Sequence, residues 1–76
     1  MATIDDVRQL EAELERMRKI VAANLAAERA KRGHSLRHVA QRVRLTAPSL
    51  MHIERGTTWR TETVARIVRF YERDAA

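Results

Sequence analysis

The sequence predicts an all-α fold, a small helical bundle preceded by a long N-terminal helix. Apolar residues recur at spacings of three and four along nearly the whole chain, which is the periodicity of amphipathic helices. No alternating run of β-branched residues is present, and the 76 residues include only 2 glycines and 1 proline. A chain of this length forms one domain with a modest core, so self-association would add useful burial.

The first predicted helix runs from Ile4 to Arg32 without a glycine or proline. Thr3 is a suitable N-cap, and Asp5 and Asp6 place negative charge in the first turn, where it suits the helix dipole. Gly33 can take the left-handed conformation that ends a helix. At 1.5 Å per residue the helix would be roughly 43 Å long. That length exceeds what a small core can cover.

The N-terminal part of this helix carries an apolar stripe with heptad spacing over two repeats: Val7, Leu10, Leu14, Met17 and Val21. The stripe predicts a self-association seam, with packing on the chain's own domain as the alternative. We therefore divide the chain into a helical extension, residues 1–20, and a domain, residues 21–73.

Three shorter helices are predicted in this domain. Ser35 caps the first, which buries Leu36, Val39, Ala40 and Val43, and a break follows at Arg44 and Leu45. Thr46 caps the second, with Pro48 in its first turn, Leu50 and Ile53 facing inward, and Gly56 at its end. Residues 57–60 form a loop in which Trp59 packs against the bundle. The last helix runs from Thr61 or Glu62 to Arg73, burying Val64, Ile67, Val68 and Tyr71, and residues 74–76 form a frayed tail.

The first two of these helices have the spacing of a helix-turn-helix. They are about eight and nine residues long and are joined by a turn of about three. Ala40 is small where the helices cross, and Leu45 fills the turn. With Leu50 and Ile53 facing inward, the opposite face of the second helix projects outward and fits the major groove of B-DNA.

The pattern resembles the Cro and phage-repressor (XRE-like) helix-turn-helix family. The resemblance covers about residues 21–71 and depends on four segments, Ser35-Leu36-Arg37-His38-Val39-Ala40-Gln41-Arg42-Val43, Leu45-Thr46, Ser49-Leu50 and Ile53-Glu54-Arg55-Gly56. It implies a lambda-repressor-like bundle of four or five helices that binds specific DNA sequences and controls transcription. It also implies a buried structural ion pair between Arg29 and Glu54.

The chain departs from the family pattern at several positions. Leu36 stands where a phosphate-contacting polar residue is common, and Arg44 stands where glycine is common, so Arg44 needs either another turn or left-handed geometry. Ala47 and Pro48 stand where polar base-reading residues are common. The base-reading set we expect is Thr46, Ala47, Pro48, Ser49, His52 and Arg55, with alanine contacting a thymine methyl group.

Phosphate contacts are expected at the edges of the motif, from Ser35, Arg37, Arg42, Arg44 and Arg60, with Arg55 as a further candidate. The charge distribution supports a polyanionic partner, because residues 19–76 carry twelve bases and five acids whereas residues 1–18 carry three bases and five acids. If about six contacts form, the logarithm of affinity should fall with that of salt concentration with a slope near about −5.

Other classes of function have little support. The chain has no cysteine, which excludes a disulfide framework and a thiolate metal site. His34 and His38 are expected to be solvated, with no further ligand to complete a metal site. No catalytic constellation, small-molecule site or cofactor motif is discernible, so we predict no enzyme. No apolar run spans a bilayer and no signal pattern is present, so we expect a cytoplasmic protein that joins the nucleoid when it binds DNA.

The sequence therefore favours a DNA-binding transcriptional regulator of the phage Cro or repressor type that occludes a promoter. Its partners would be an operator duplex and its own copy, paired through the N-terminal helix or on DNA only. Two alternatives stay open at this point. The chain could be the DNA-binding antitoxin of a toxin–antitoxin pair, or an interaction adaptor that uses the long helix and no longer binds DNA.

Overall fold

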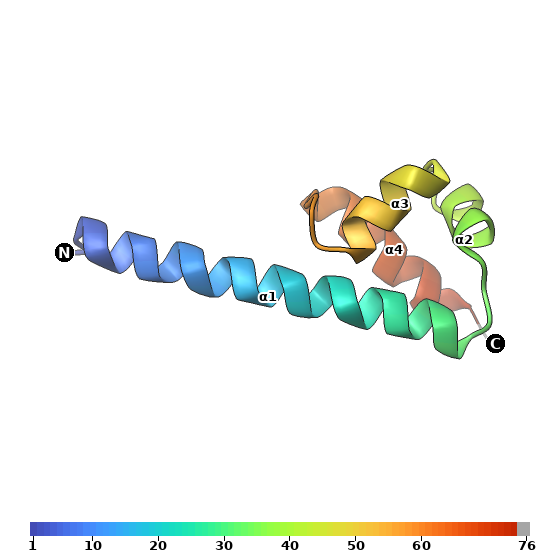
Figure 1. Ribbon diagram of the computed structural model, residues 1–76, viewed down its shortest axis with the longest axis horizontal. Helices are drawn as coiled ribbons and strands as arrows, with labels where there is room; N and C mark the ends of the chain where they lie inside the picture. The colour runs from blue at the N-terminus through green and yellow to red at the C-terminus, as the bar shows by residue number, and fades with distance from the viewer. Residues whose placement is uncertain (75–76) are drawn as a thin grey trace.

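A computed structural model describes residues 1–74, and this part of the chain consists of α-helices joined by short turns. The helices are α1 (Ile4–Lys31), α2 (Leu36–Arg42), α3 (Ala47–Glu54) and α4 (Thr61–Arg73). In Figure 1, α2, α3 and α4 gather over the C-terminal half of α1, and the N-terminal half projects alone. The molecule is accordingly elongated, 46 × 23 × 18 Å. The prediction of a small all-α bundle preceded by a long helix is confirmed.

The helices begin where the polar caps predict. The Thr3 hydroxyl accepts from the Asp6 backbone N–H, and the Asp6 carboxylate accepts from the Thr3 N–H, which forms a capping box. The hydrogen bond from the Thr3 backbone N–H to the Asp6 carboxylate, followed by the interaction of the Thr3 side chain with that carboxylate, lowers the pKa of Asp6. The Ser35 and Thr46 hydroxyls cap α2 and α3 by accepting from the backbone N–H groups of His38 and Ser49, without a capping box. Gly33, with φ 72°, ends α1 in the left-handed region that glycine tolerates.

The core lies between the C-terminal half of α1 and the three shorter helices. Its largest fully buried side chains are Val39, Val43, Leu50 and Ile67. Leu25 is the residue of α1 in this cluster, and Leu36, Leu45 and Trp59 pack against it half-buried. The inward positions expected from helical spacing are therefore buried, apart from partial exposure at Leu36 and Leu45 and the exposure of Val68.

Val68 is a correction to the expected core. It is 39% exposed, although its neighbour Ile67 is fully buried. Because α4 packs through Val64, Ile67 and Tyr71, Val68 lies at the edge of its buried face. There it lines an open apolar groove between α1 and α4, and no further element within residues 1–74 covers that groove.

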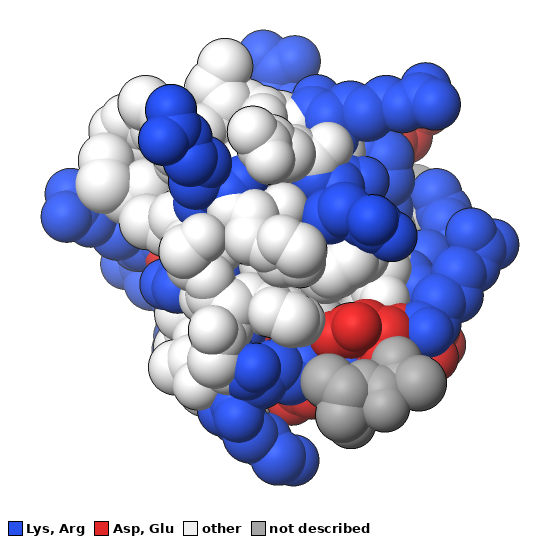
Figure 2. All heavy atoms as spheres, turned by 90° about the vertical axis from the view of Figure 1, so that its right-hand side faces the viewer, with Lys and Arg blue, Asp and Glu red and all other residues white. Residues whose placement is uncertain are grey.

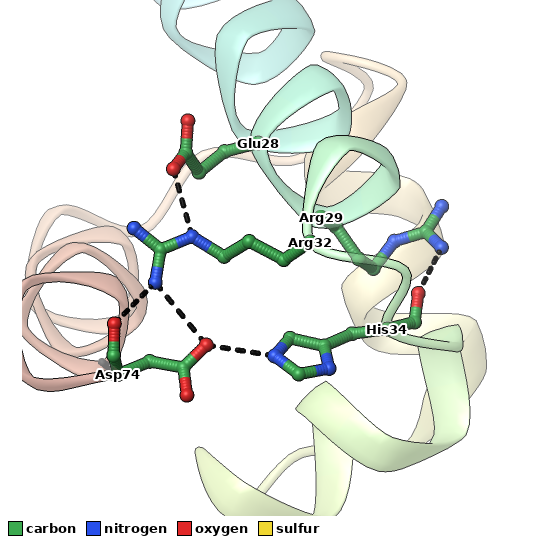
Figure 3. A network of polar contacts seen from close by, with 5 residues as sticks. All are labelled: Glu28, Arg29, Arg32, His34 and Asp74. Carbon is green, nitrogen blue, oxygen red and sulfur yellow. Dashed lines mark hydrogen bonds and ion pairs between the residues drawn. The ribbon is translucent and has the colours of Figure 1, made fainter. Parts of the chain in front are cut away.

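The end of α4 is another correction, because Asp74 is tied to the body of the molecule instead of fraying (Figure 3). Arg32 Nη1 donates to the Asp74 carbonyl oxygen at 2.7 Å and to its carboxylate at 3.1 Å. His34 Nε2 lies 2.7 Å from the same carboxylate, and Arg32 Nε donates to Glu28. The hydrogen bond from His34, followed by that from Arg32, lowers the pKa of Asp74. The expected tail residues 75 and 76 lie outside the described residues.

His34 is also not the solvated surface residue we expected. Its ring is half-buried, with its centroid 4.7 Å from that of His38 and 6.1 Å from that of Phe70. His38 is exposed, as expected. No group of three potential metal-ligating side chains occurs among residues 1–74. The two rings pack on one another, and His34 is also hydrogen-bonded to Asp74.

Candidate nucleic-acid interface

The turn between α2 and α3 is built on a left-handed residue. Arg44 has φ 61°. It occupies the position at which glycine is common in the family pattern. Directly after it, the Leu45 backbone N–H donates to the Ala40 carbonyl oxygen at 2.8 Å, which ties the turn to α2. Leu45 packs half-buried against the core, and Thr46 then starts α3. A left-handed non-glycine residue costs about 1–2 kcal/mol, so the turn stores strain at an exposed arginine.

The inner face of α3 is held by apolar packing and by one ion pair to α1. Leu50 and Ile53 are buried in the core. Glu54 accepts from Arg29 Nε at 2.9 Å and from Arg29 Nη2 at 3.0 Å, with side chains 7% and 21% exposed. Arg29 Nη1 also donates to the His34 carbonyl oxygen, so one guanidinium joins α1, α3 and the turn before α2. The hydrogen bonds to Glu54 raise the pKa of Arg29, and α3 is thereby fixed in its orientation.

The opposite face of α3 is open. Pro48, Ser49, His52 and Arg55 are exposed, and Ala47 and Met51 are half-exposed. The Thr46 hydroxyl accepts from the Ser49 N–H and donates to Ser49 Oγ at 2.8 Å, so both functions of Thr46 are engaged at the cap. Ser49 keeps its own hydroxyl hydrogen, which is free to meet an outside acceptor.

Thr57 determines which nitrogen of His52 carries hydrogen. The Thr57 hydroxyl donates to the His52 carbonyl oxygen at 3.0 Å, and His52 Nδ1 lies 3.2 Å from the same hydroxyl oxygen. A hydroxyl has one hydrogen, so Nδ1 must be the donor in this second contact. The Nε2 atom of the neutral ring is then an acceptor, exposed on the outer face of α3.

A polar depression lies beside α3, between it and the start of α4. Its volume is about 490 Å³, and its polar lining includes Ser49, His52, Arg60, Thr63 and Arg66. Arg66 Nε is buried and has no hydrogen-bond partner in the described residues. Sequence reasoning missed Thr63 and Arg66. Arg60, Thr63 and Arg66 are each three residues apart, and this helical spacing is the signal that could have placed them on one side of α4.

The chain can now be compared with known proteins. Residues 20–76, three quarters of the chain, match a family described as a helix-turn-helix domain. The chain belongs to this helix-turn-helix family. No curated protein and no solved structure matches it. The family and the exposed α3 together support a DNA-binding regulator, and such domains typically have no catalytic role.

The edges of the helix-turn-helix carry the expected phosphate-contacting residues. Arg37, Arg44 and Arg60 are exposed. The Ser35 hydroxyl is exposed and accepts from the His38 N–H at the start of α2. Arg42 lies elsewhere, in a groove that it lines with Arg66, Arg69 and Arg73. Figure 2 shows Lys and Arg side chains around much of the rim of this end of the molecule, with few acidic atoms.

The predicted self-association seam lies away from this surface. Val7, Leu10, Leu14 and Met17 all lie on the projecting half of α1 and are exposed.

In residues 1–74 no helix combines the length and apolar character needed to cross a membrane. Trp59 packs against the core, as expected, and the Arg18 guanidinium carbon lies 5.5 Å from its ring centroid.

Proposed function

We propose that the chain is a sequence-specific regulator of transcription, of the Cro or phage-repressor type, that occludes a promoter by placing α3 in the major groove of an operator. The DNA-binding unit is residues 21–73, and residues 1–20 form an extension to it. The observation that carries the proposal is the division of α3 into two faces. Leu50, Ile53 and Glu54 anchor one face, and the other is free along its whole length.

The outer face of α3 offers a short series of base contacts. His52 Nε2 can accept from the exocyclic amine of adenine or cytosine, and a protonated ring would instead donate to guanine. Ser49 can donate its free hydroxyl hydrogen, and Arg55 can bind guanine bidentately. Ala47 and Pro48 offer apolar contact with a thymine methyl group. Thr46 contributes chiefly by capping the helix and orienting Ser49.

Phosphate contacts hold this helix in register. Ser35, Arg37, Arg44 and Arg60 are exposed in α2 and in the segments next to the helices of the helix-turn-helix, and Arg42 extends the basic surface toward its own groove. Arg66 lines the depression beside α3 together with Arg60. A phosphate bound there would be attracted by both guanidinium groups.

The test is selection of bound sites from a pool of random duplexes, followed by affinity measurements against salt concentration. We expect one enriched sequence, and we expect Arg55→Ala/Arg60→Ala to weaken binding and flatten the log–log salt slope by about 2. The control, Arg8→Ala/Arg16→Ala, removes the same charge from the projecting half of α1 and should leave the slope nearly unchanged. A variant at Arg55 and Arg60 that binds like the wild type would refute the DNA contacts assigned to these two arginines, and a failure to bind any duplex would favour the adaptor function.

A further inference from the structure

The projecting half of α1 presents an apolar stripe that no other helix of the described chain covers. Val7, Leu10, Leu14 and Met17 are between 42% and 59% exposed. The stripe does not end where the domain begins, because Val21 leads it into the groove that Val68, Leu25 and Tyr71 line between α1 and α4. One continuous apolar surface therefore runs from the free end of α1 onto α4. A surface of this kind on a small domain marks an interaction site.

We propose that this surface binds the same surface of a second copy, with the two α1 helices antiparallel. In heptad terms Val7, Leu14 and Val21 occupy a positions, and Leu10, Met17 and Asn24 occupy d positions. An antiparallel pair stacks a against d. Residue 14 of one copy then packs against residue 17 of the other, residue 10 against residue 21, and residue 7 against residue 24. The two-fold axis passes between residues 15 and 16.

The charge along α1 favours this direction. Residues 4–17 carry five acids and two bases, a net charge of −3. Residues 18–31 carry four bases and one acid, a net charge of +3. An antiparallel pair lays each acidic half beside the basic half of the other copy, whereas a parallel pair lays like beside like. The helix dipoles also oppose one another favourably only in the antiparallel pair.

The residues flanking the seam lead to the same conclusion. The e positions include Glu11 and Arg18, which face one another between antiparallel copies, twice by symmetry. Glu13, at a g position, then faces the apolar Ile20. In a parallel pair Glu13 would face Arg18, but Asp6 would face Glu11, which repels it. Only the antiparallel pair is free of repulsive flanking contacts.

The antiparallel arrangement also covers the open groove beside Val68. Ile4, 69% exposed and at an e position, then faces Leu25 of the second copy at the edge of that copy's groove. Val7 of the same helix lies one layer further in, over Asn24 and Val21. The exposed apolar residues Ile4 and Val7 of one copy thus cover the apolar groove of the other.

Two-fold symmetry adds an argument that rests on the proposed DNA binding. The seam lies about 75° around α1 from the face that holds the domain, at 100° per residue. An antiparallel pair has its two-fold axis perpendicular to the helices, so both domains lie on the same side and both α3 helices can meet one duplex. A parallel pair has its axis along the helices and turns the two domains to opposite sides.

Sedimentation equilibrium without DNA tests whether the seam associates. We expect the wild type to dimerise and Leu14→Asp/Met17→Asp to be a folded monomer by circular dichroism. The matched control, Ala12→Asp/Ala23→Asp, introduces the same charges on the opposite, exposed side of α1 and should dimerise like the wild type. A monomeric wild type, or a seam variant that still dimerises, would overturn the proposal. DNA binding is assayed separately. A chain that dimerises but binds no DNA would refute the proposed function and would leave the dimer proposal standing.

Charge reversal distinguishes the two directions. Glu11→Arg and Glu13→Arg change net charge equally on the same exposed helix. In the antiparallel pair Glu11→Arg sets arginine against Arg18 and should weaken dimerisation about fivefold, whereas Glu13→Arg should change it little. In a parallel pair Glu11→Arg would relieve the repulsion from Asp6 and strengthen the dimer, and Glu13→Arg would weaken it. That inverse pattern would overturn the antiparallel assignment. Low ionic strength keeps both effects measurable.

Discussion

Replacement of Glu54 by alanine tests the anchor that orients α3. The Glu54 side chain is 7% exposed, and within residues 1–74 its hydrogen bonds come from Arg29 alone, at 2.9, 3.0 and 3.2 Å. Removal of one partner of a buried ion pair typically costs 3–5 kcal/mol, because the other charge is left without compensation. Arg29 is 21% exposed and keeps its hydrogen bond to the His34 carbonyl oxygen, so water can partly hydrate it. We therefore expect Glu54→Ala to lower the free energy of unfolding by about 3 kcal/mol, at the lower end of that range.

The reciprocal variant should be at least as damaging. Arg29→Ala leaves the Glu54 carboxylate buried at 7% exposure without any donor, and it also removes the donor to the His34 carbonyl oxygen. Glu54→Gln is the control, because it keeps the shape and one acceptor while it removes the charge. Its cost should fall between those of the wild type and the alanine variant.

Urea unfolding followed by circular dichroism, at one fixed protein concentration, measures these differences. For a domain of this size 1 kcal/mol shifts the melting temperature by about 4–8 °C, so Glu54→Ala should melt more than about 10 °C below the wild type. A loss under half a kcal/mol would show that the pair is effectively solvated. An Arg29→Ala variant less damaging than Glu54→Ala would refute the reasoning from burial.

Three further results are expected. Arg44→Gly should stabilise the fold by about 0.5–1 kcal/mol, because Arg44 has φ 61° and glycine adopts this region without strain; a destabilised variant in urea unfolding would contradict this. Asp74→Asn should lower the melting temperature at neutral pH, and the difference from the wild type should vanish in acid. The pKa of Asp74 is lowered in the folded protein, so its carboxylate stabilises the fold at pH values above the pKa of the unfolded chain. This contribution is lost as the pH falls through the pKa of the folded protein. A difference that persisted at low pH would count against the His34 and Arg32 contacts. Burial raises the pKa of Tyr71, the single tyrosine, to about 12, so ultraviolet titration should show ionisation near that pH, and stability should fall as pH rises from about 10. Ionisation near pH 10 in the folded protein would indicate a solvated ring.

Local features of the fold followed from the sequence because they depend on neighbours in the chain. Thr3, Ser35 and Thr46 cap their helices through contacts three residues away, and helical spacing placed Leu50 and Ile67 in the core. The outer face of α3 was predictable for the same reason, since an inward Leu50 and Ile53 leave one side free.

The remaining features depend on how distant segments meet. The contact between His34 and Asp74 joins residues 40 apart, and nothing near either residue signals it. Val68 is exposed because of the rotation of α4 against α1, which periodicity alone does not determine at the edge of a stripe. Arg66 reaches the interface only because α4 begins beside α3.

The proposed function requires DNA to contact the outer face of α3. The most direct measurement is the change in amide and side-chain NMR shifts as a selected duplex is added to the labelled protein. We expect the largest changes at Ser49, His52 and Arg55 and in the loop of residues 57–60, with little change along residues 4–17. Large changes confined to the projecting half of α1, with α3 unaffected, would contradict the account.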